Sequence, residues 1–271
     1  MKQGVQRVLT ALVGIPVFLG ALWLGGWVFL VLIGVIALAA QAEMIKLIRA
    51  DGTNADLWVS LLAGGAVFVR FLAPEGWMVA LLAISLVLGW TLRKPVSDAV
   101  GRISGGLASL IYPVLLISLV VDIRWQAHEA WGQTDGFLLT LLLIVLIWAT
   151  DSGAYYTGKS IGKRPFSPSI SPNKTWEGTL GGLLLGTLVA VGFKYWLLPM
   201  LTWSDVFVLA AIGGFWGQLG DLLESSLKRS AGVKDSGNFL PGHGGALDRF
   251  DSLIFSAPLY WAWLTYFSNL L

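Results

Sequence analysis

The sequence contains no cysteine and few charged residues, and each shortage excludes a class of protein. Without cysteine there is no disulfide bond, no thiolate metal ligand and no cysteine nucleophile. Any metal ion must then be bound by carboxylates, histidine or backbone oxygens, which favours Mg²⁺ or another hard cation. Charged residues make up only 13% of the chain, against roughly 25% in an ordinary soluble domain. The chain therefore cannot cover a water-facing surface in the usual way.

Apolar residues are abundant, at 56% of the chain, and the mean hydropathy is +0.74. A helix needs about 20 mostly apolar residues to cross a bilayer. Because a backbone in lipid must satisfy its own hydrogen bonds, and the apolar runs are too long for barrel strands, we predict an all-α, polytopic integral membrane protein. About nine transmembrane helices are expected, at 8–25, 27–42, 57–72, 77–92, 105–121, 136–149, 178–200, 205–220 and 252–271. The first run is long for a signal peptide, so we expect a retained helix.

The basic residues are distributed unevenly over the predicted loops. With nine spans, all of the 18 Lys and Arg residues fall on one side of the membrane except Arg70, Arg124 and Lys194. Basic residues favour the cytoplasmic side. We therefore predict a protein of the inner (plasma) membrane of the cell. Its N-terminus is predicted to be cytoplasmic and its C-terminus to face outward.

The most polar stretch of the chain runs from residue 225 to residue 251, and it reads SSLKRSAGVKDSGNFLPGHGGALDRFD. It lies between two apolar, nearly charge-free runs. Polar groups joined to membrane spans are costly to keep, so they indicate a functional site. Asp221, just upstream of this stretch, shares one helix face with Ser225 and Lys228, and Asp248 and Asp251 share another. The three carboxylates fit either a network of salt bridges or a divalent cation.

A glycine-rich turn, PGHGG at 241–245, lies between these carboxylates. Glycine permits positive φ and close approach of the backbone to a ligand. His243 has no apolar helix face to pack on, so we expect it to contact a ligand.

A second polar loop, 157–178, ends in SPNKTWEG just before a predicted helix. The free N–H groups and positive dipole end of a helix N-terminus suit phosphate, and Lys174 can add a point charge. An ordinary positive-inside loop is the alternative for Lys159, Lys163 and Arg164.

The first half of the chain is predicted to be a transmembrane scaffold of about five helices, residues 1–135. Residues 136–271 are the predicted catalytic region of about four helices with the two polar cytoplasmic loops. Glu43, Lys46 and Arg49 follow a helical spacing near the end of one scaffold helix. We interpret them as a solvated helix face.

Carboxylates for Mg²⁺, many cations and glycine-rich turns at a membrane surface are typical of phosphoryl or nucleotidyl transfer. The sequence has no GxxxxGK[ST] motif, which excludes a P-loop enzyme. Ser225 and Ser226 lack the signature of an activated hydroxyl, which excludes serine hydrolysis.

Residues 225–251 resemble the signature of the phosphatidate cytidylyltransferase (CDP-diacylglycerol synthase) family. The resemblance is carried by Ser225-x-Leu227-Lys228-Arg229, Lys234-Asp235-x-Gly237 and Leu240-Pro241-x-His243-Gly244-Gly245-x-Leu247-Asp248-Arg249-Phe250-Asp251. Upstream, Asp151-x-Gly153-Ala154-Tyr155 and Ser171-Pro172-Asn173-Lys174-Thr175-Trp176-Glu177-Gly178 are also similar to that family. Ala246 departs from it, since a larger aliphatic residue is expected there.

The resemblance implies transfer of a cytidylyl group from CTP to phosphatidic acid, giving CDP-diacylglycerol and pyrophosphate for phospholipid biosynthesis. It implies Mg²⁺, with K⁺ as a second cation, bound by Asp221, Asp248 and Asp251. These three and Lys228 are the expected catalytic residues. The expected substrate-binding residues are Ser171, Asn173, Lys174, Glu177, Ser225, Arg229, Lys234, Asp235, His243 and Arg249. The expected partners are CTP, phosphatidic acid, the bilayer and a second copy of the chain, with no nucleic acid.

Two other functions fit part of the pattern. A transporter for a phosphorylated anion also uses charges within membrane helices, but it should place them near the midplane rather than at one side. A CTP-dependent kinase acting on a polyprenol would share the substrate and the location. CTP labelled in one phosphate distinguishes the three functions. Cytidylyl transfer labels the lipid from the α-phosphate, a kinase labels it from the γ-phosphate, and a transporter labels no lipid.

Overall fold

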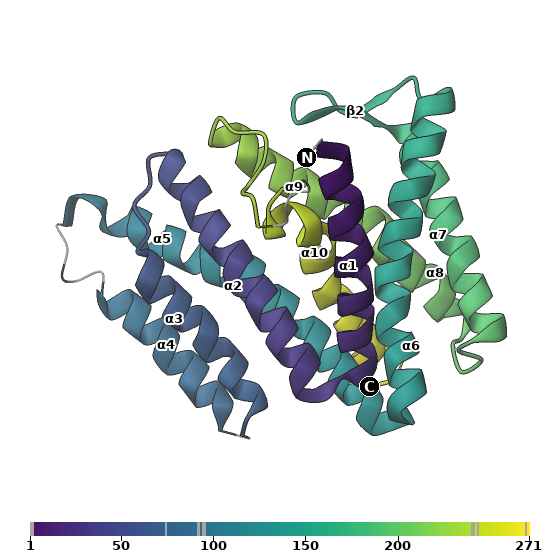
Figure 1. The fold of residues 1–271 in the computed structure, drawn as a ribbon, viewed down its shortest axis with the longest axis horizontal. Helices are drawn as coiled ribbons and strands as arrows, with labels where there is room; N and C mark the ends of the chain where they lie inside the picture. The colour runs from purple at the N-terminus through teal and green to yellow at the C-terminus, as the bar shows by residue number, and fades with distance from the viewer. Residues whose placement is uncertain are drawn as a thin grey trace. The chain divides into compact units, whose positions relative to one another are not determined.

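The computed structural model of the protein describes residues 3–73, 75–90, 93, 96–239, 242, 244–268 and 270–271. Figure 1 shows that these residues form helices almost throughout, which confirms the all-α prediction. The helical elements are α1 (Gln3–Leu24), α2 (Gly26–Ala50), α3 (Leu57–Phe68), η1 (Val69–Phe71), α4 (Gly76–Trp90), η3 (Val96–Asp98), α5 (Ala99–Leu110), η4 (Ile111–Leu115), α6 (Leu116–Ile161), α7 (Trp176–Trp196), α8 (Trp203–Ala211), η5 (Ile212–Trp216), α9 (Gly217–Ser230) and α10 (Ala246–Tyr266).

Within the described residues, five helical stretches are long and apolar enough to cross a membrane: Gly4–Leu24, Gly26–Ala50, Val96–Ile161, Trp176–Trp196 and Trp203–Ser230. Two shorter apolar stretches are Leu57–Phe71 and Gly76–Trp90. The stretch Val96–Ile161 contains two of the predicted spans, and it is interrupted at Gly132, whose φ of 81° is not helical. The protein is thus a multi-pass membrane protein, while the number nine and the side of the N-terminus stay predictions.

The chain divides into two compact units. Unit 1 comprises Met1–Ala21, Gly26–Ser118 and Leu227–Phe250, and unit 2 comprises Leu22–Gly25, Leu119–Ser226 and Asp251–Leu271. The polar stretch at 225–251 therefore contributes mainly to unit 1, together with α2 to α5. The predicted division of the chain into a scaffold, residues 1–135, and a catalytic region, residues 136–271, stays a prediction.

In unit 1, α3 packs side by side with α4 and with α2, as Figure 1 shows. Small residues allow the close approach: Ala37 and Ala40 on α2 and Ala63 on α3 are buried. The amide of Gln41 fixes this contact by donating to the backbone oxygen of Ser60 at 2.8 Å. The apolar faces of these helices thus form the core of the unit.

In unit 2, glycines bring α6 and α7 together. A Cβ on Gly182 would lie 2.6 Å from the backbone oxygen of Thr150, and one on Gly153 would lie 2.9 Å from that of Gly181. These glycines therefore allow the two helices to pack closely. In α9, Gly220 has the same role toward α10, because its Cβ would lie 2.6 Å from that of Phe255.

The loop between α6 and α7 contains a short hairpin that the sequence did not predict. Strands β1 (Pro165–Ser167) and β2 (Ser171–Thr175) pair antiparallel. The hairpin leads directly into α7, as Figure 1 shows. Thr175 caps that helix, since its hydroxyl accepts from the Gly178 N–H at 3.1 Å. The hairpin therefore holds Ser171, Asn173 and Lys174 on a paired backbone rather than in an irregular loop.

Candidate active site

Unit 2 joins two of the predicted site residues in an ion pair. The Nζ of Lys174, on β2, lies 2.7 Å from Oδ2 of Asp221, on α9. It also lies 3.4 Å from the backbone oxygen of Gln218. The hydroxyl of Ser225, one turn further along α9, donates to Oδ1 of Asp221 at 3.2 Å. We call Lys174, Asp221, Ser225, Gln218 and Thr179 the Lys174 cluster.

Two members of this cluster were missed by sequence reasoning. Thr179, in the first turn of α7, donates to Oε1 of the buried Gln218 at 2.8 Å. Gln218 lies three residues before Asp221, on the same face of the helix. This spacing is the sequence signal that could have identified it. Its Nε2 is buried and has no hydrogen-bond partner among the described residues. The amide is therefore held by Thr179 at one end and keeps a donor at the other.

Asp251 adds a second carboxylate to the electrostatics of unit 2. It is buried, and its charge is repelled by Asp221 and Asp151 and attracted by Lys174. Asp151 lies in a motif that the family resemblance marked, but it received no predicted role. The structure thus brings Asp251 within electrostatic range of two other carboxylates and of one lysine.

These carboxylates are the chemical type of donor that Mg²⁺ prefers, and a divalent cation would relieve their mutual repulsion. Their oxygen atoms are not gathered, however. Across the described ranges, no three Asp, Glu or His side chains are arranged as ligands of one metal ion. The donor chemistry of Asp221 and Asp251 fits Mg²⁺. Binding of Mg²⁺ by these two residues and by Asp248 stays a prediction, as does binding of K⁺.

Unit 1 contains a second ion pair between predicted site residues. The Nζ of Lys228 lies 2.6 Å from Oδ1 of Asp248. Oδ2 of Asp248 accepts from the N–H of Ser236 at 2.9 Å, from the hydroxyl of Ser236 at 2.9 Å and from the N–H of Gly245 at 2.8 Å. Asp248 therefore accepts hydrogen bonds on both oxygens, and Oδ2, with three donors around it, is the more crowded of the two.

Glycines shape the backbone around Asp248, as the sequence predicted for the turn at 241–245. Gly242 has a φ of 78° and Gly244 a φ of 91°, which are left-handed conformations that favour glycine. A Cβ on Gly244 would lie 3.0 Å from Oδ2 of Asp248. His243, Leu240 and Pro241 lie outside the described residues.

The prediction for Glu43 is wrong. Its side chain does not face solvent: the residue is only 4% exposed, whereas Lys46 and Arg49 of the same helix are exposed as expected. Oε2 of Glu43 accepts from the Leu247 N–H at 2.9 Å and from the Ser236 hydroxyl at 3.1 Å. A segment about 200 residues away in the chain covers this part of α2, and helical periodicity carries no signal of that. We call Glu43, Lys228, Ser236, Gly245 and Asp248 the Asp248 cluster.

The other predicted site residues make local contacts or are exposed to solvent. Glu177 accepts from the N–H groups of Lys163 and Arg164 at 3.1 and 3.2 Å, so it ties the base of the hairpin to α7. Arg229 donates to the backbone oxygen of Val233 at 3.2 Å. Asn173, Lys234, Asp235 and Arg249 are exposed, and Ser171 is half-buried. Several cations are thus available to an anion that approaches from solvent.

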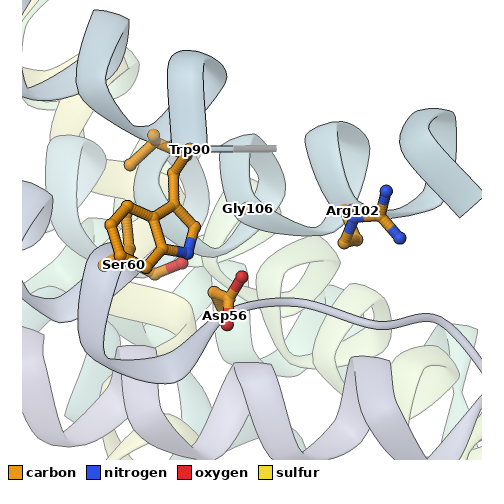
Figure 2. A pocket seen from close by; sticks show the side chains of 7 residues that line it. Asp56, Ser60, Trp90, Arg102 and Gly106 are labelled. Carbon is orange, nitrogen blue, oxygen red and sulfur yellow. The ribbon is translucent and has the colours of Figure 1, made fainter. Parts of the chain in front are cut away.

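A small hollow in unit 1 contains none of the predicted site residues. Figure 2 shows Asp56 and Ser60 from the start of α3, Trp90 from α4, and Arg102 and Gly106 from α5 around it. The buried guanidinium of Arg102 lies 3.8 Å from Asp98. The lining of the hollow combines one cation, one indole and one carboxylate. The hollow does not extend the candidate active site.

Comparison with known proteins gives a consistent result over nearly the whole chain. The model of the cytidylyltransferase family matches residues 5–267. The chain is 35% identical over 272 residues to phosphatidate cytidylyltransferase of Bacillus subtilis, covering 97% of this chain and 98% of the relative. It is 35% identical over 261 residues to the protein of that name in Staphylococcus aureus strain COL, covering 93% and 96%. The Synechocystis protein of that name is 34% identical over 283 residues, covering 94% of each chain.

Proposed function

The chain belongs to the cytidylyltransferase family, and we propose that it transfers a cytidylyl group from CTP to phosphatidic acid with the help of a divalent cation. The products are CDP-diacylglycerol and pyrophosphate. Relatives at about 35% identity are named for phosphatidate as the acceptor. The enzyme is therefore a membrane-embedded nucleotidyltransferase of phospholipid biosynthesis.

The structural observation that carries this function is the pairing of lysines with carboxylates in both clusters. Lys174 pairs with Asp221 and Lys228 pairs with Asp248. A lysine ammonium can hold a phosphate oxygen as a point charge, and a carboxylate can hold a hard cation. Transfer between two phosphorylated substrates needs both kinds of group, because catalysis rests mainly on positioning and on neutralising charge.

The reaction requires no covalent enzyme intermediate. A phosphate oxygen of phosphatidic acid attacks the α-phosphorus of CTP and forms the new P–O bond. The bond between that phosphorus and the oxygen bridging to the β-phosphate breaks, and pyrophosphate leaves with the bonding electrons. The acceptor phosphate is already a nucleophile, so holding the two phosphates in line is the main task of the protein.

We assign the residues to roles on this basis. Lys174 and Lys228 hold phosphate oxygens, and the exposed Arg229, Lys234 and Arg249 attract the approaching anions. Ser171, Asn173, Ser225, Asp235 and His243 contribute polar contacts to the substrates, and Glu177 fixes the hairpin that presents Lys174. A cation bound by Asp221 and Asp251 would neutralise phosphate charge.

The location follows from the substrates and from the basic residues. CTP is dissolved in the cytoplasm, phosphatidic acid lies in the bilayer, and the predicted cytoplasmic side carries nearly all Lys and Arg. We propose an active site at the cytoplasmic face of the inner membrane. A homodimer is part of the proposal, and light scattering of the detergent-purified protein tests it.

One assay tests the reaction and its cation requirement together. Detergent-purified protein is incubated with phosphatidic acid and Mg²⁺, and with CTP labelled in either the α- or the γ-phosphate. Label is expected in an organic-soluble product from α-labelled CTP only. EDTA should abolish the transfer and added Mg²⁺ should restore it.

Each alternative gives a different result. Label from the γ-phosphate would indicate a lipid kinase, and an absence of labelled lipid from folded protein would favour a transporter. Unchanged transfer in EDTA would contradict the cation. A reaction without phosphatidic acid is the matched blank.

A further inference from the structure

We propose that Glu43, on α2, is a positioning residue for the reaction: it holds the Ser236 hydroxyl and the Leu247 N–H so that Asp248 and Lys228 keep their geometry. This inference rests on the roles proposed above for Lys228 and Asp248. It gives a function to a helix of the half of the chain that the sequence predicted to be scaffold.

The carboxylate of Glu43 is buried. A buried carboxylate is costly unless donors compensate it. At 4% exposure, Glu43 accepts from the Leu247 N–H at 2.9 Å and lies 3.1 Å from the Ser236 hydroxyl, which it shares with Asp248. Both donate to the same atom, Oε2. Ser236 and Leu247 stand at the two ends of the glycine-rich segment, so one carboxylate oxygen ties the ends together.

Leu247 lies at the start of α10. The first N–H groups of a helix have no partner within the helix, and the helix dipole favours a negative charge there. Glu43 supplies that charge from another helix. Because Asp248 is the next residue of α10, the bond to Leu247 places the backbone that carries Asp248.

Side chains link Glu43 to Lys228. The Ser236 hydroxyl lies 3.1 Å from Oε2 of Glu43 and 2.9 Å from Oδ2 of Asp248. A hydroxyl has a single proton to donate, so the two carboxylates share one donor. Asp248 in turn holds Lys228 at 2.6 Å. A displacement of Glu43 therefore reaches Asp248 and Lys228 through one hydroxyl.

The carboxylate of Glu43 explains two glycines of the motif. A Cβ on Gly237 would lie closer than 3.0 Å to the carboxylate of Glu43, and so would one on Gly245. Neither residue has a positive φ, so the backbone does not require glycine at these two positions. The three nearest atoms to a Cβ on Gly237 all belong to the Glu43 side chain. These glycines make room for Glu43.

The first experiment compares Glu43→Gln with Glu43→Met in the full-length, detergent-purified enzyme. Glutamine keeps one carbonyl oxygen that can accept from both donors, whereas methionine has a similar size and no comparable acceptor. We expect Glu43→Met to lower kcat about 10-fold or more, because small misplacements of reacting groups are costly, and Glu43→Gln to stay within about threefold of wild type. Glu75→Gln, at an exposed position, is the matched control.

The separate values of kcat and KM distinguish positioning from a purely structural role. A structural role would lower the melting temperature and the folded fraction but leave kcat per folded molecule unchanged. Wild-type kcat in folded Glu43→Met would overturn the proposal, and so would a Glu43→Gln enzyme as impaired as Glu43→Met. Lys228→Met is measured alongside. A wild-type kcat in this variant would overturn the proposal that Glu43 acts on the reaction through Asp248 and Lys228.

The second experiment starts from Gly237→Ala, a single variant that keeps the Glu43 carboxylate and therefore remains informative if Glu43→Met fails to fold. Gly237→Ala is made in the wild type and in Glu43→Ala. Alone, it should displace the Glu43 carboxylate and lower both the melting temperature and kcat. In the Glu43→Ala background the obstructing atoms are gone, so the same change should have little further effect. Equal effects in both backgrounds would overturn the proposal.

Failure of this inference can be told apart from failure of the proposed function. If wild type makes CDP-diacylglycerol and the Glu43 variants match it, only the inference fails. If wild type makes no CDP-diacylglycerol, the function fails, while the coupling of melting temperatures between Glu43 and Gly237 still reports the contact.

Discussion

The ammonium of Lys174 lies 2.7 Å from Oδ2 of Asp221, so a residue of the hairpin before α7 is paired with a residue of α9. The exposed fraction of the side chain is 23% for Lys174 and 38% for Asp221. Ion pairs with this much solvent access contribute about 0–1 kcal/mol to stability. The pair is therefore better suited to presenting a charge to a ligand than to holding the fold.

Replacement of Lys174 by methionine should consequently impair catalysis more than folding. Loss of a charged contact to phosphate, typically about 1.5–3 kcal/mol, corresponds to a drop in kcat/KM of roughly 10- to 150-fold. Lys174→Arg keeps the charge and should recover part of that loss. The measurement is kcat/KM for CTP together with the melting temperature. A large fall in melting temperature with kcat/KM retained would show that the pair is structural.

Asp248→Asn should abolish activity while the protein remains folded. Asparagine has the same shape, and its carbonyl oxygen can still accept from Ser236 and Gly245. Its amide would then face Lys228 and could no longer pair with it. We expect activity to fall at least about 100-fold, since the buried pair loses its charge partner. The measurement is transfer of label from CTP to lipid.

The control for this prediction is Glu75→Gln, which removes an exposed carboxylate. Monodisperse elution of both variants would establish that they are folded. Wild-type activity in folded Asp248→Asn would contradict every role assigned to Asp248, as metal ligand or as partner of Lys228.

The sequence was sufficient to predict the fold class and the position of the polar segments. Apolar runs of membrane length allow few structures other than helices, and the structure is helical in those regions. The polar groups at the ends of α9 and α10 stood out because charges are rare in this chain. Asp221, Lys228, Asp248 and Lys174 were therefore found as candidates before any contact was known.

The partners of these residues could not be predicted in the same way. That Lys174 pairs with Asp221, and Lys228 with Asp248, depends on contacts between segments up to about 50 residues apart. The hairpin at 165–175 was missed because its short strands are rich in serine, proline and asparagine and contain a single β-branched residue, Thr175. Glu43 was misassigned because its burial depends on residues 236–247.

The last prediction concerns Arg124, which holds the C-terminal end of α1 in unit 2. Arg124 is 2% exposed. It donates to the backbone oxygen of Leu22 at 2.9 Å, to that of Trp23 at 3.1 Å and to Oε1 of Gln133 at 3.1 Å. The carbonyls at the end of a helix lack partners within the helix, and the guanidinium satisfies two of them with its planar set of donors.

Arg124→Met should lower the free energy of unfolding by about 1–3 kcal/mol, since the Leu22 oxygen loses its donor while Trp23 keeps a bond from Gln133. Arg124→Lys should recover little of the lost stability, because the ammonium of lysine cannot reproduce the planar, forked set of donors of a guanidinium. Titration of the purified protein with denaturing detergent measures the change, and the exposed Arg93→Gln is its control. The kcat of the folded fraction should remain at the wild-type value, since the hydrogen-bond partners of Arg124 in the described part of the chain are Leu22, Trp23 and Gln133, none of which is assigned to the reaction. A fall in kcat at unchanged stability would mean that this end of α1 takes part in catalysis.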